Sequence, residues 1–171
     1  FWPISNVGST TFNTNARRGL RFQVPFPCRV VGARVYMITS STGDFSVGIY
    51  DDAGSEVSSS ITAFDRSQFL CGVNTATLEC YFDNTATLAA NTWYRLAVEA
   101  TTATNVGLYH IDVADPAIRS GIPGGTNVHL TTYSGSWTDS DTDTVPLLDL
   151  IIDQLDDGAG SGGARQKVYG G

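Results

Sequence analysis

Three aspartates at alternate positions are the first residues in this sequence whose types and spacing suggest chemistry. Asp139, Asp141 and Asp143 lie in the segment WTDSDTDT, which begins at Trp137. Calcium prefers carboxylate oxygens as ligands, and a D-x-D-x-D run is how many calcium-binding loops begin. The segment lacks the glycine at the sixth loop position and the glutamate at the twelfth that complete an EF-hand. Two alternatives stay open, a calcium site of another kind and a solvated acidic turn.

A tryptophan and an arginine form the second candidate site. Residues 93–100 alternate between apolar and polar side chains, which places Trp93 and Arg95 together on the outward face of a strand. An exposed indole can stack on a sugar ring while a neighbouring polar group fixes the hydroxyls. Trp137, next to loop residues, is a third member. These residues predict a contact with a glycan or a partner protein, and the alternative is packing against this chain's own tail or a loop.

Motifs for enzyme catalysis are weak. Gly158, Gly160 and Gly163 match G-x-G-x-x-G, but no βαβ unit surrounds them. There is no G-x-S-x-G nucleophile elbow, and His110 and His129 fall in strand-like segments. A glycosidase needs two carboxylates flanking a cleft, and a hydrolase that uses aspartates remains the third alternative. We therefore expect a protein that is not an enzyme.

The cysteines leave two interpretations open. Cys28, Cys71 and Cys80 make an odd number, and the last two bracket a short segment that a hairpin disulfide would close. The alternative is that all three are small buried apolar side chains. No Cys/His grouping suggests zinc. We expect no cofactor apart from the calcium ion considered above.

Composition and charge restrict the class of protein. The chain has 171 residues and a net charge of -7, which opposes binding to nucleic acid phosphates. No run of 18 apolar residues occurs, so the sequence predicts no membrane-spanning helix. Charged residues make up 16%, against about 25% in typical domains, and Thr, Ser, Asn and Gly replace them. Such a polar surface is typical of secreted and virion-surface β-proteins, which places this chain on a virion or an extracellular surface.

The periodicity of the sequence predicts an all-β fold. Stretches of alternating apolar and polar residues recur between turn signals such as Asp51–Gly54, and helical periodicity is almost absent. This rhythm predicts an antiparallel β-sandwich, jelly-roll-like in its topology. The expected strands are 20–24, 31–37, 45–49, 76–82, 94–100, 106–111, 128–133 and 147–152.

The sequence divides into a domain and a tail. Residues 1–155 carry the strand pattern, whereas residues 156–171 are rich in glycine and have little apolar content before Val168 and Tyr169. Such a segment cannot bury enough surface to fold alone. We expect a β-sandwich domain followed by a flexible Gly-rich C-terminal tail or arm, which only another body such as a neighbouring subunit would order.

Four segments within residues 21–109 carry a resemblance to a known family, and they are FQVP, VVGARV, FSVGIYDDAG and LAANTWYRLAVE. They resemble jelly-roll sandwich domains of tailed-phage virion proteins, both fibres and capsid decoration proteins, and of some bacterial surface proteins. The carboxyl end, with WTDSDTD and DLIIDQLDDG before the glycines, is similar to the ends of phage proteins. The resemblance implies a virion or surface component that symmetry repeats many times, and it assigns a role to no single residue.

Together these observations predict a non-enzymatic virion structural protein, either a capsid decoration (cement) protein or a fibre or spike domain. It would act by self-association as a homo-oligomer, a trimer in our expectation, and by contact with major capsid or tail proteins or a host-surface glycan. No nucleic acid and no membrane partner is expected. The alternative is a carbohydrate-binding adhesion module with Trp93, Arg95 and Trp137 as its platform.

Overall fold

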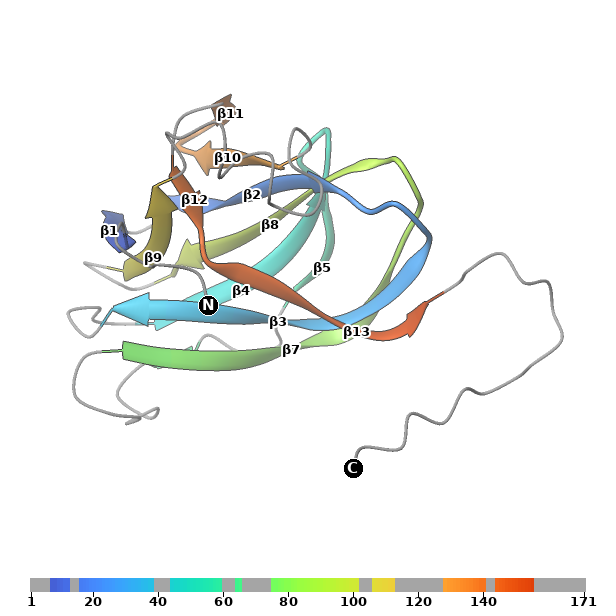
Figure 1. The fold of residues 1–171 in the computed structure, drawn as a ribbon, viewed down its shortest axis with the longest axis horizontal. Coiled ribbons are helices and arrows are strands. Elements are labelled where there is room, and N and C mark those ends of the chain that lie inside the picture. Colours follow the sequence, from blue (N-terminus) through green and yellow to red (C-terminus); the bar gives the residue numbers. More distant parts are fainter. Residues whose placement is uncertain are drawn as a thin grey trace, which may run out of the picture.

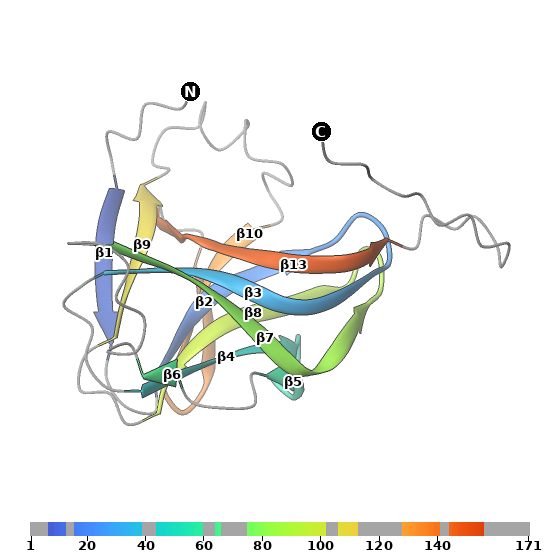
Figure 2. The same ribbon diagram turned by 90° about the horizontal axis from the view of Figure 1, so that it is seen from below.

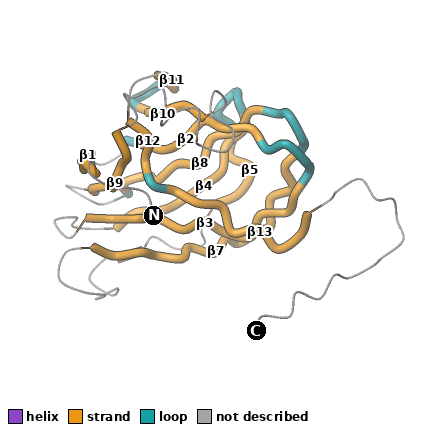
Figure 3. Tube along the Cα trace, in the orientation of Figure 1, coloured by secondary structure: helices purple, strands orange, loops and turns teal. Residues whose placement is uncertain are grey.

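The computed structural model describes residues 7–12, 16–38, 44–59, 64–65, 75–101, 106–112, 128–140 and 144–155. The regular elements within these ranges are all strands, drawn in orange in Figure 3. No helix in these ranges is long and apolar enough to span a membrane. The Gly-rich segment 156–171 lies outside the described residues, so the division at residue 155 stays a prediction.

The strands form two antiparallel sheets that lie one above the other (Figure 1). Within the described residues, sheet A contains β1 (Val7–Phe12), β3 (Cys28–Ile38), β7 (Thr75–Leu88), β9 (Val106–Asp112), β12 (Thr144–Pro146) and β13 (Leu148–Leu155). Sheet B contains β2 (Arg17–Gln23), β4 (Asp44–Asp51), β5 (Glu56–Ser59), β6 (Phe64–Asp65), β8 (Trp93–Ala100), β10 (Val128–Tyr133) and β11 (Trp137–Ser140). The predicted antiparallel β-sandwich is confirmed.

The strand pairs are nested in the order of a jelly roll. Strand β1 pairs with β9, β2 with β8, β3 with β7 and β4 with β5, so each earlier strand takes a later partner. The pairs alternate between the sheets, with β1–β9 and β3–β7 in sheet A and β2–β8 and β4–β5 in sheet B. A folded-over ribbon of antiparallel pairs gives this arrangement, which is that of a double-sheet jelly roll.

The last strands of the described chain add to both sheets. Strands β10 and β11 form a hairpin that extends sheet B beyond β2. Strand β13 lies beside β3 over residues 28–35, and β9 reaches β3 only at the pair Met37–Leu108. Figure 2 shows β13, β3 and β7 as one layer in front of β4 and β8.

The core fills the space between the two sheets because inward side chains alternate with outward ones along each strand. Its members include Val30, Val35 and Met37 from sheet A and Phe45 and Leu96 from sheet B, all at most 1% exposed. The predicted alternation is confirmed for these strands. The same alternation fixes which side chains reach the outer faces, and this places the candidate site.

The sequence pattern missed the described strands β1, β5, β6, β11 and β12 and ended β7 too early. Residues 137–140 were expected in an acidic loop but form β11, and residues 56–59 form β5 where a Ser-rich loop was expected. Strand β7 continues past Phe82 to Leu88. A register shift opposite β3 makes room for residues 82–85, whose polar run Asp83-Asn84-Thr85 hides the strand from a pattern search.

Two of the three cysteines are buried in the core. Cys28 and Cys80 are free thiols, 1% and 0% exposed. Burial raises the pKa of both thiols, that of Cys80 to about 12. The interpretation of small buried apolar side chains is confirmed for these two, and Cys71 lies outside the described residues.

The buried thiols provide a test of the packing. In a Cys71→Ser variant at pH 8, we expect Cys28 and Cys80 to react with Ellman's reagent only as fast as the sandwich opens, because the attacking species is the thiolate. The rate of absorbance change would measure this. In urea both thiols should react at once, and fast reaction of both without denaturant would contradict the described core.

Candidate functional site

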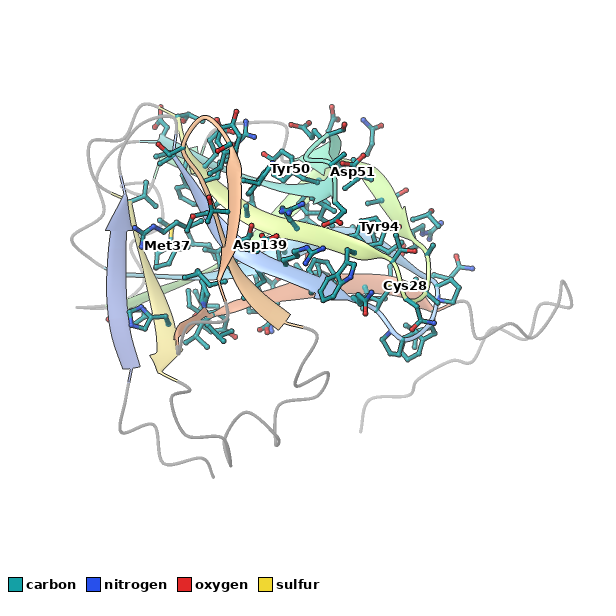
Figure 4. All side chains as sticks on the ribbon, turned by 90° about the horizontal axis from the view of Figure 1, so that it is seen from above. Cys28, Met37, Tyr50, Asp51, Tyr94 and Asp139 are labelled. Carbon is teal, nitrogen blue, oxygen red and sulfur yellow. The ribbon has the colours of Figure 1, made fainter. Side chains whose placement is uncertain are left out.

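The outer face of sheet B brings the candidate residues together. Trp93 and Arg95 point outward from β8, and Trp137 and Asp139 from β11 lie on the same side, joined by Tyr50 from β4. Figure 4 shows Asp139 on the hairpin that crosses this face and Tyr50 and Asp51 at the end of β4. The sequence therefore places these side chains on one face, as predicted for Trp93 and Arg95.

Small residues form the middle of this face, which we call its floor. Gly19, Gly48 and Ala97 occupy neighbouring outward positions on β2, β4 and β8 and are buried. A Cβ atom on Gly19 would lie 1.9 Å from the carbonyl oxygen of Leu96, so only glycine fits there. The β10–β11 hairpin reaches over the sheet to the end of β4, where Trp137 contacts Tyr50.

Arg95 is the centre of the contacts on this face. Its residue is 5% exposed, and its guanidinium donates to Thr131 Oγ1 (3.2 Å), to Asp139 Oδ2 (2.8 Å) and to the carbonyl oxygens of Asp51 and Asp52. The planar fork of an arginine suits several acceptors at once. Removing one partner of such a buried pair typically costs about 3–5 kcal/mol, because the remaining charge stays buried. Arg95 therefore joins β8, the β4–β5 turn and the β10–β11 hairpin.

Two carboxylates neutralise a pair of arginines. Arg21 and Arg95 are directly opposite in the β2–β8 register, where like charges repel. Asp52 accepts two hydrogen bonds from Arg21 at 2.8 and 3.0 Å and lies 3.2 Å from Arg95 Nη1, and Asp139 also lies close to both arginines. The hydrogen bonds from Arg21 hold the pKa of the Asp52 carboxyl below its usual value.

Arg17 lies within an aromatic cluster. Its guanidinium carbon is 4.8 Å from the ring centroid of Tyr50, 4.7 Å from that of Tyr133 and 5.9 Å from that of Trp137. Glu99 completes the enclosure with an ion pair of 3.0 Å. Cation–π contacts of this kind contribute about 0.5–2 kcal/mol each, more where water is excluded. Burial raises the pKa of the Tyr50 phenol to about 12.

The turn after β4 holds Trp137 in place. Gly54 has a φ of +93°, and a Cβ atom there would lie 2.3 Å from Trp137 Nε1. Trp137 also contacts the rings of Tyr50 and Tyr133 at centroid distances of 5.2 and 5.1 Å. The indole is half-buried, contacts its own chain on several sides and belongs to the packing of the hairpin.

Trp93 lies at the start of β8, directly after the exposed residues Asn91 and Thr92. Its indole is half-buried, and the guanidinium carbon of Arg21 lies 4.1 Å from the ring centroid. Gln23 is opposite it in the register and donates to the carbonyl oxygen of Asn91 at 3.1 Å. Asn91 has a φ of +54°, which only a few per cent of non-glycine residues adopt. This part of the face, at the end of the sandwich, can be reached from solvent.

The three residues predicted as a glycan or partner platform therefore have different surroundings. Arg95 is buried and hydrogen-bonded within the chain, Trp137 is half-buried against Gly54 and two tyrosine rings, and Trp93 is half-buried beside Arg21. The contact role of these residues stays a prediction, and both indoles retain part of their exposed surface. The alternative of packing within the chain describes the surroundings of Arg95.

The calcium prediction rests on one described residue. Asp139 Oδ1 accepts a hydrogen bond from Thr131 at 2.7 Å, and its Oδ2 accepts one from Arg95. Asp141 and Asp143 lie outside the described residues. No group of three potential ligands that could hold a metal occurs among the residues that the structure describes. Calcium binding stays a prediction, and Asp139 would have to exchange a cationic partner for the ion.

Sequence reasoning missed Arg17, Arg21, Asp52, Tyr50 and Gly54 as members of this face. A signal existed for some of them, since Tyr50 alternates outward from the β4 pattern and Gly54 ends the acidic turn. No motif indicated that β11 would reach the end of β4, because β10, β2 and β8 stand between the two in the sheet order. The comparisons with known proteins do not assign the site: no protein-family model and no curated protein matches this chain.

Two glycines with positive φ allow a matched test of the Trp137 contact. Gly54→Ala introduces an unfavourable φ and a clash with Trp137, whereas Gly135→Ala introduces only the φ, since a Cβ at Gly135 (φ +82°) meets nothing within 4 Å. We expect Gly135→Ala to cost about 1–2 kcal/mol and Gly54→Ala about 1–3 kcal/mol more. Urea denaturation would measure both, and equal costs would show that Trp137 is not held by the turn.

The raised pKa of Tyr50 predicts a loss of stability in alkali. A phenol whose pKa is raised by folding, from 10.0 to about 12, stabilises the fold fully below pH 10 and loses this contribution as the pH rises toward 12. The loss is on the order of 2 kcal/mol. We expect Tyr50→Phe to flatten the dependence of the free energy of unfolding on pH between pH 10 and 12, as measured by urea denaturation. Tyr81→Phe, at an exposed position, should give the same pH dependence as the parent protein.

Proposed function

We propose that this chain is a non-enzymatic virion structural domain, a capsid decoration (cement) protein or a fibre or spike domain, which acts by self-association and surface contact. It assembles as a homo-oligomer, a trimer, on a virion or an extracellular surface. Its partners besides itself are major capsid or tail proteins. The jelly-roll topology is in keeping with this proposal by analogy of fold, because viral capsid domains use that architecture among other proteins.

The observation that carries the proposal is a group of exposed apolar side chains at one end of the sandwich. Phe26 is 41% exposed in the β2–β3 connection, and Ile152 and Leu155, at the end of β13, are 40% and 56% exposed. Leu155 pairs with Cys28, two residues after Phe26, so the three lie close in the register. We call these residues the β13 patch, which lies at the end where β13 finishes beside the β2–β3 connection (Figures 1 and 2).

An apolar patch of this kind supports a role in protein contact. Exposed large apolar side chains scattered singly are ordinary, but grouped ones mark interaction surfaces. Arg29 and Asp153 form an ion pair at 2.6 Å beside the patch, which supplies a polar border. A polar rim around an apolar centre is the usual anatomy of a protein interface. Closed symmetry would multiply a modest contact per copy.

The charged groups on the outer face of sheet B support the non-enzymatic part of the proposal. Arg17, Arg21 and Arg95 are paired with Glu99, Asp52 and Asp139. A general acid or base needs a free lone pair or proton directed at a substrate. Here each of the three carboxylates is paired with an arginine, and the pairs contribute to the stability of the face.

Light scattering on the purified protein tests the proposal. We expect a stable oligomer whose mass falls toward that of the monomer in an Ile152→Ser/Leu155→Ser double variant. Val57→Ser, which removes a side chain of similar exposure (40%) from β5, is the control and should leave the mass unchanged. A parent protein that is monomeric at every concentration would contradict self-association in solution. Repeating the measurement with a chelator tests the calcium prediction, because a mass or stability that falls on chelation requires a bound ion.

A further inference from the structure

We propose that the rim at the start of β8 is a binding site for a neutral pyranose, formed by Trp93, Arg21, Gln23, Asp52 and Asn91. We call these residues the Trp93 rim. The site differs from the platform that the sequence predicted, because Arg95 and Trp137 support it from within the outer face of sheet B. The rim shares no residue with the β13 patch, although Asn91 is hydrogen-bonded to Val24 in the same β2–β3 connection that carries Phe26.

The indole of Trp93 supplies the apolar surface. It points outward from the first residue of β8. The Arg21 guanidinium lies over the ring, 4.1 Å from its centroid, so it fixes the orientation of the indole and a sugar would stack on the opposite face. Arg21 is itself fixed by two hydrogen bonds to Asp52. A ring that is oriented in advance loses little conformational entropy when a ligand stacks on it. Pyranoses present C–H groups on one side of the ring, which pack well on an indole.

Three polar side chains come from segments next to the indole, since Gln23 pairs with Trp93 in the register, Asn91 precedes it by two residues, and Asp52 is bonded to Arg21. The Asp52 side chain is 48% exposed, although Arg21 and Arg95 hold it in place. A carboxylate has about four lone-pair sites, so it can accept from a sugar hydroxyl as well. Gln23 donates through Nε2 to the Asn91 carbonyl, and its amide oxygen is not used in that bond. Figure 4 marks the neighbourhood of this rim through Tyr94 and Asp51, which pair in the β4–β8 register.

Asn91 is held in a conformation that glycine would adopt at lower cost. Its φ is +54°, and its backbone N–H donates to the carbonyl of Val24 at 2.8 Å, which joins the β7–β8 and β2–β3 connections. Asparagine is among the few non-glycine residues that accept this region. The exposed amide at a fixed backbone position is a preorganised donor and acceptor beside Trp93, and strained residues of this kind gather at binding sites.

The charge balance selects a neutral sugar. The positive charges of Arg21 and Arg95 are matched by Asp52 and Asp139, so the rim offers no uncompensated cation to a carboxylate or sulfate group. Asp52 remains half exposed, and the whole chain carries a net charge of -7. An anionic sugar would be repelled at moderate salt. The ligand class is therefore a neutral hexopyranose or N-acetylhexosamine with an apolar ring face.

Saturation-transfer NMR with defined glycosides tests the site on the full chain. The probes are the methyl glycosides of glucose, galactose, mannose and N-acetylglucosamine, with N-acetylneuraminic acid as the anionic comparison. We expect at least one neutral glycoside to bind with a dissociation constant of about 1–10 mM and a weaker signal or none from the acid. Trp93→Ala should weaken binding at least about tenfold. Tyr81→Ala, which removes an exposed aromatic ring from sheet A, should leave it unchanged.

The Asn91→Gly variant separates binding from folding. Glycine suits a φ of +54°, so we expect thermal stability to be kept or raised while glycoside binding weakens several-fold. The proposal is overturned if none of the neutral glycosides binds, if binding survives Trp93→Ala, or if only the anionic sugar binds. Light scattering on the same samples reports self-association independently, so failure of this site and failure of the assembly proposal are distinguishable.

Discussion

The buried guanidinium of Arg95 is the constraint on which the outer face of sheet B depends. A charge at 5% exposure is tolerated only where its donors are satisfied, and the acceptors come from β10, β11 and the turn that follows β4. These segments are far apart in the sequence, and the guanidinium fixes their separation. The rings of Tyr50, Tyr133 and Trp137 then pack around Arg17 in the space between these segments. Arg21 extends the network to the rim, so the orientation of Trp93 is coupled to a buried ion pair.

The two faces of sheet B are therefore filled by different chemistry. The inner face packs aliphatic and aromatic side chains against sheet A, whereas the outer face packs arginines against rings and carboxylates. Packing on the outer face depends on the relative orientation of the polar groups, because hydrogen bonds and ion pairs restrict geometry more narrowly than apolar contact does. Such a face holds a shape at the surface without a large apolar area. A rigid, polar surface of this kind suits a domain that meets partners or sugars in water.

Much of the fold could be predicted from the sequence, and the site only in part. Alternation along 31–37 and 94–100 reports burial directly, so the sheets and the outward placement of Trp93 and Arg95 followed from local pattern. Burial of Arg95 did not, because it depends on where β11 lies, and β11 reaches the end of β4 although β10, β2 and β8 stand between the two in the sheet order. The run at Asp139 shows the same limit. Its alternate spacing fits a calcium loop and an outward strand face equally well, and the structure shows that the described residue, Asp139, lies in a strand paired with β10.

The nested strand pairing also sets the order in which this chain can fold. Val7 in β1 pairs with Ile111 in β9, and Cys28 at the start of β3 pairs with Leu155 at the end of β13. During synthesis the edges of the early strands therefore stay unpaired until their partner strands, about a hundred residues later, have been made. Long-range closure of this kind slows folding and leaves nascent chains open to association with one another. In a chain with this strand order, the demand on chaperones during synthesis follows from topology alone.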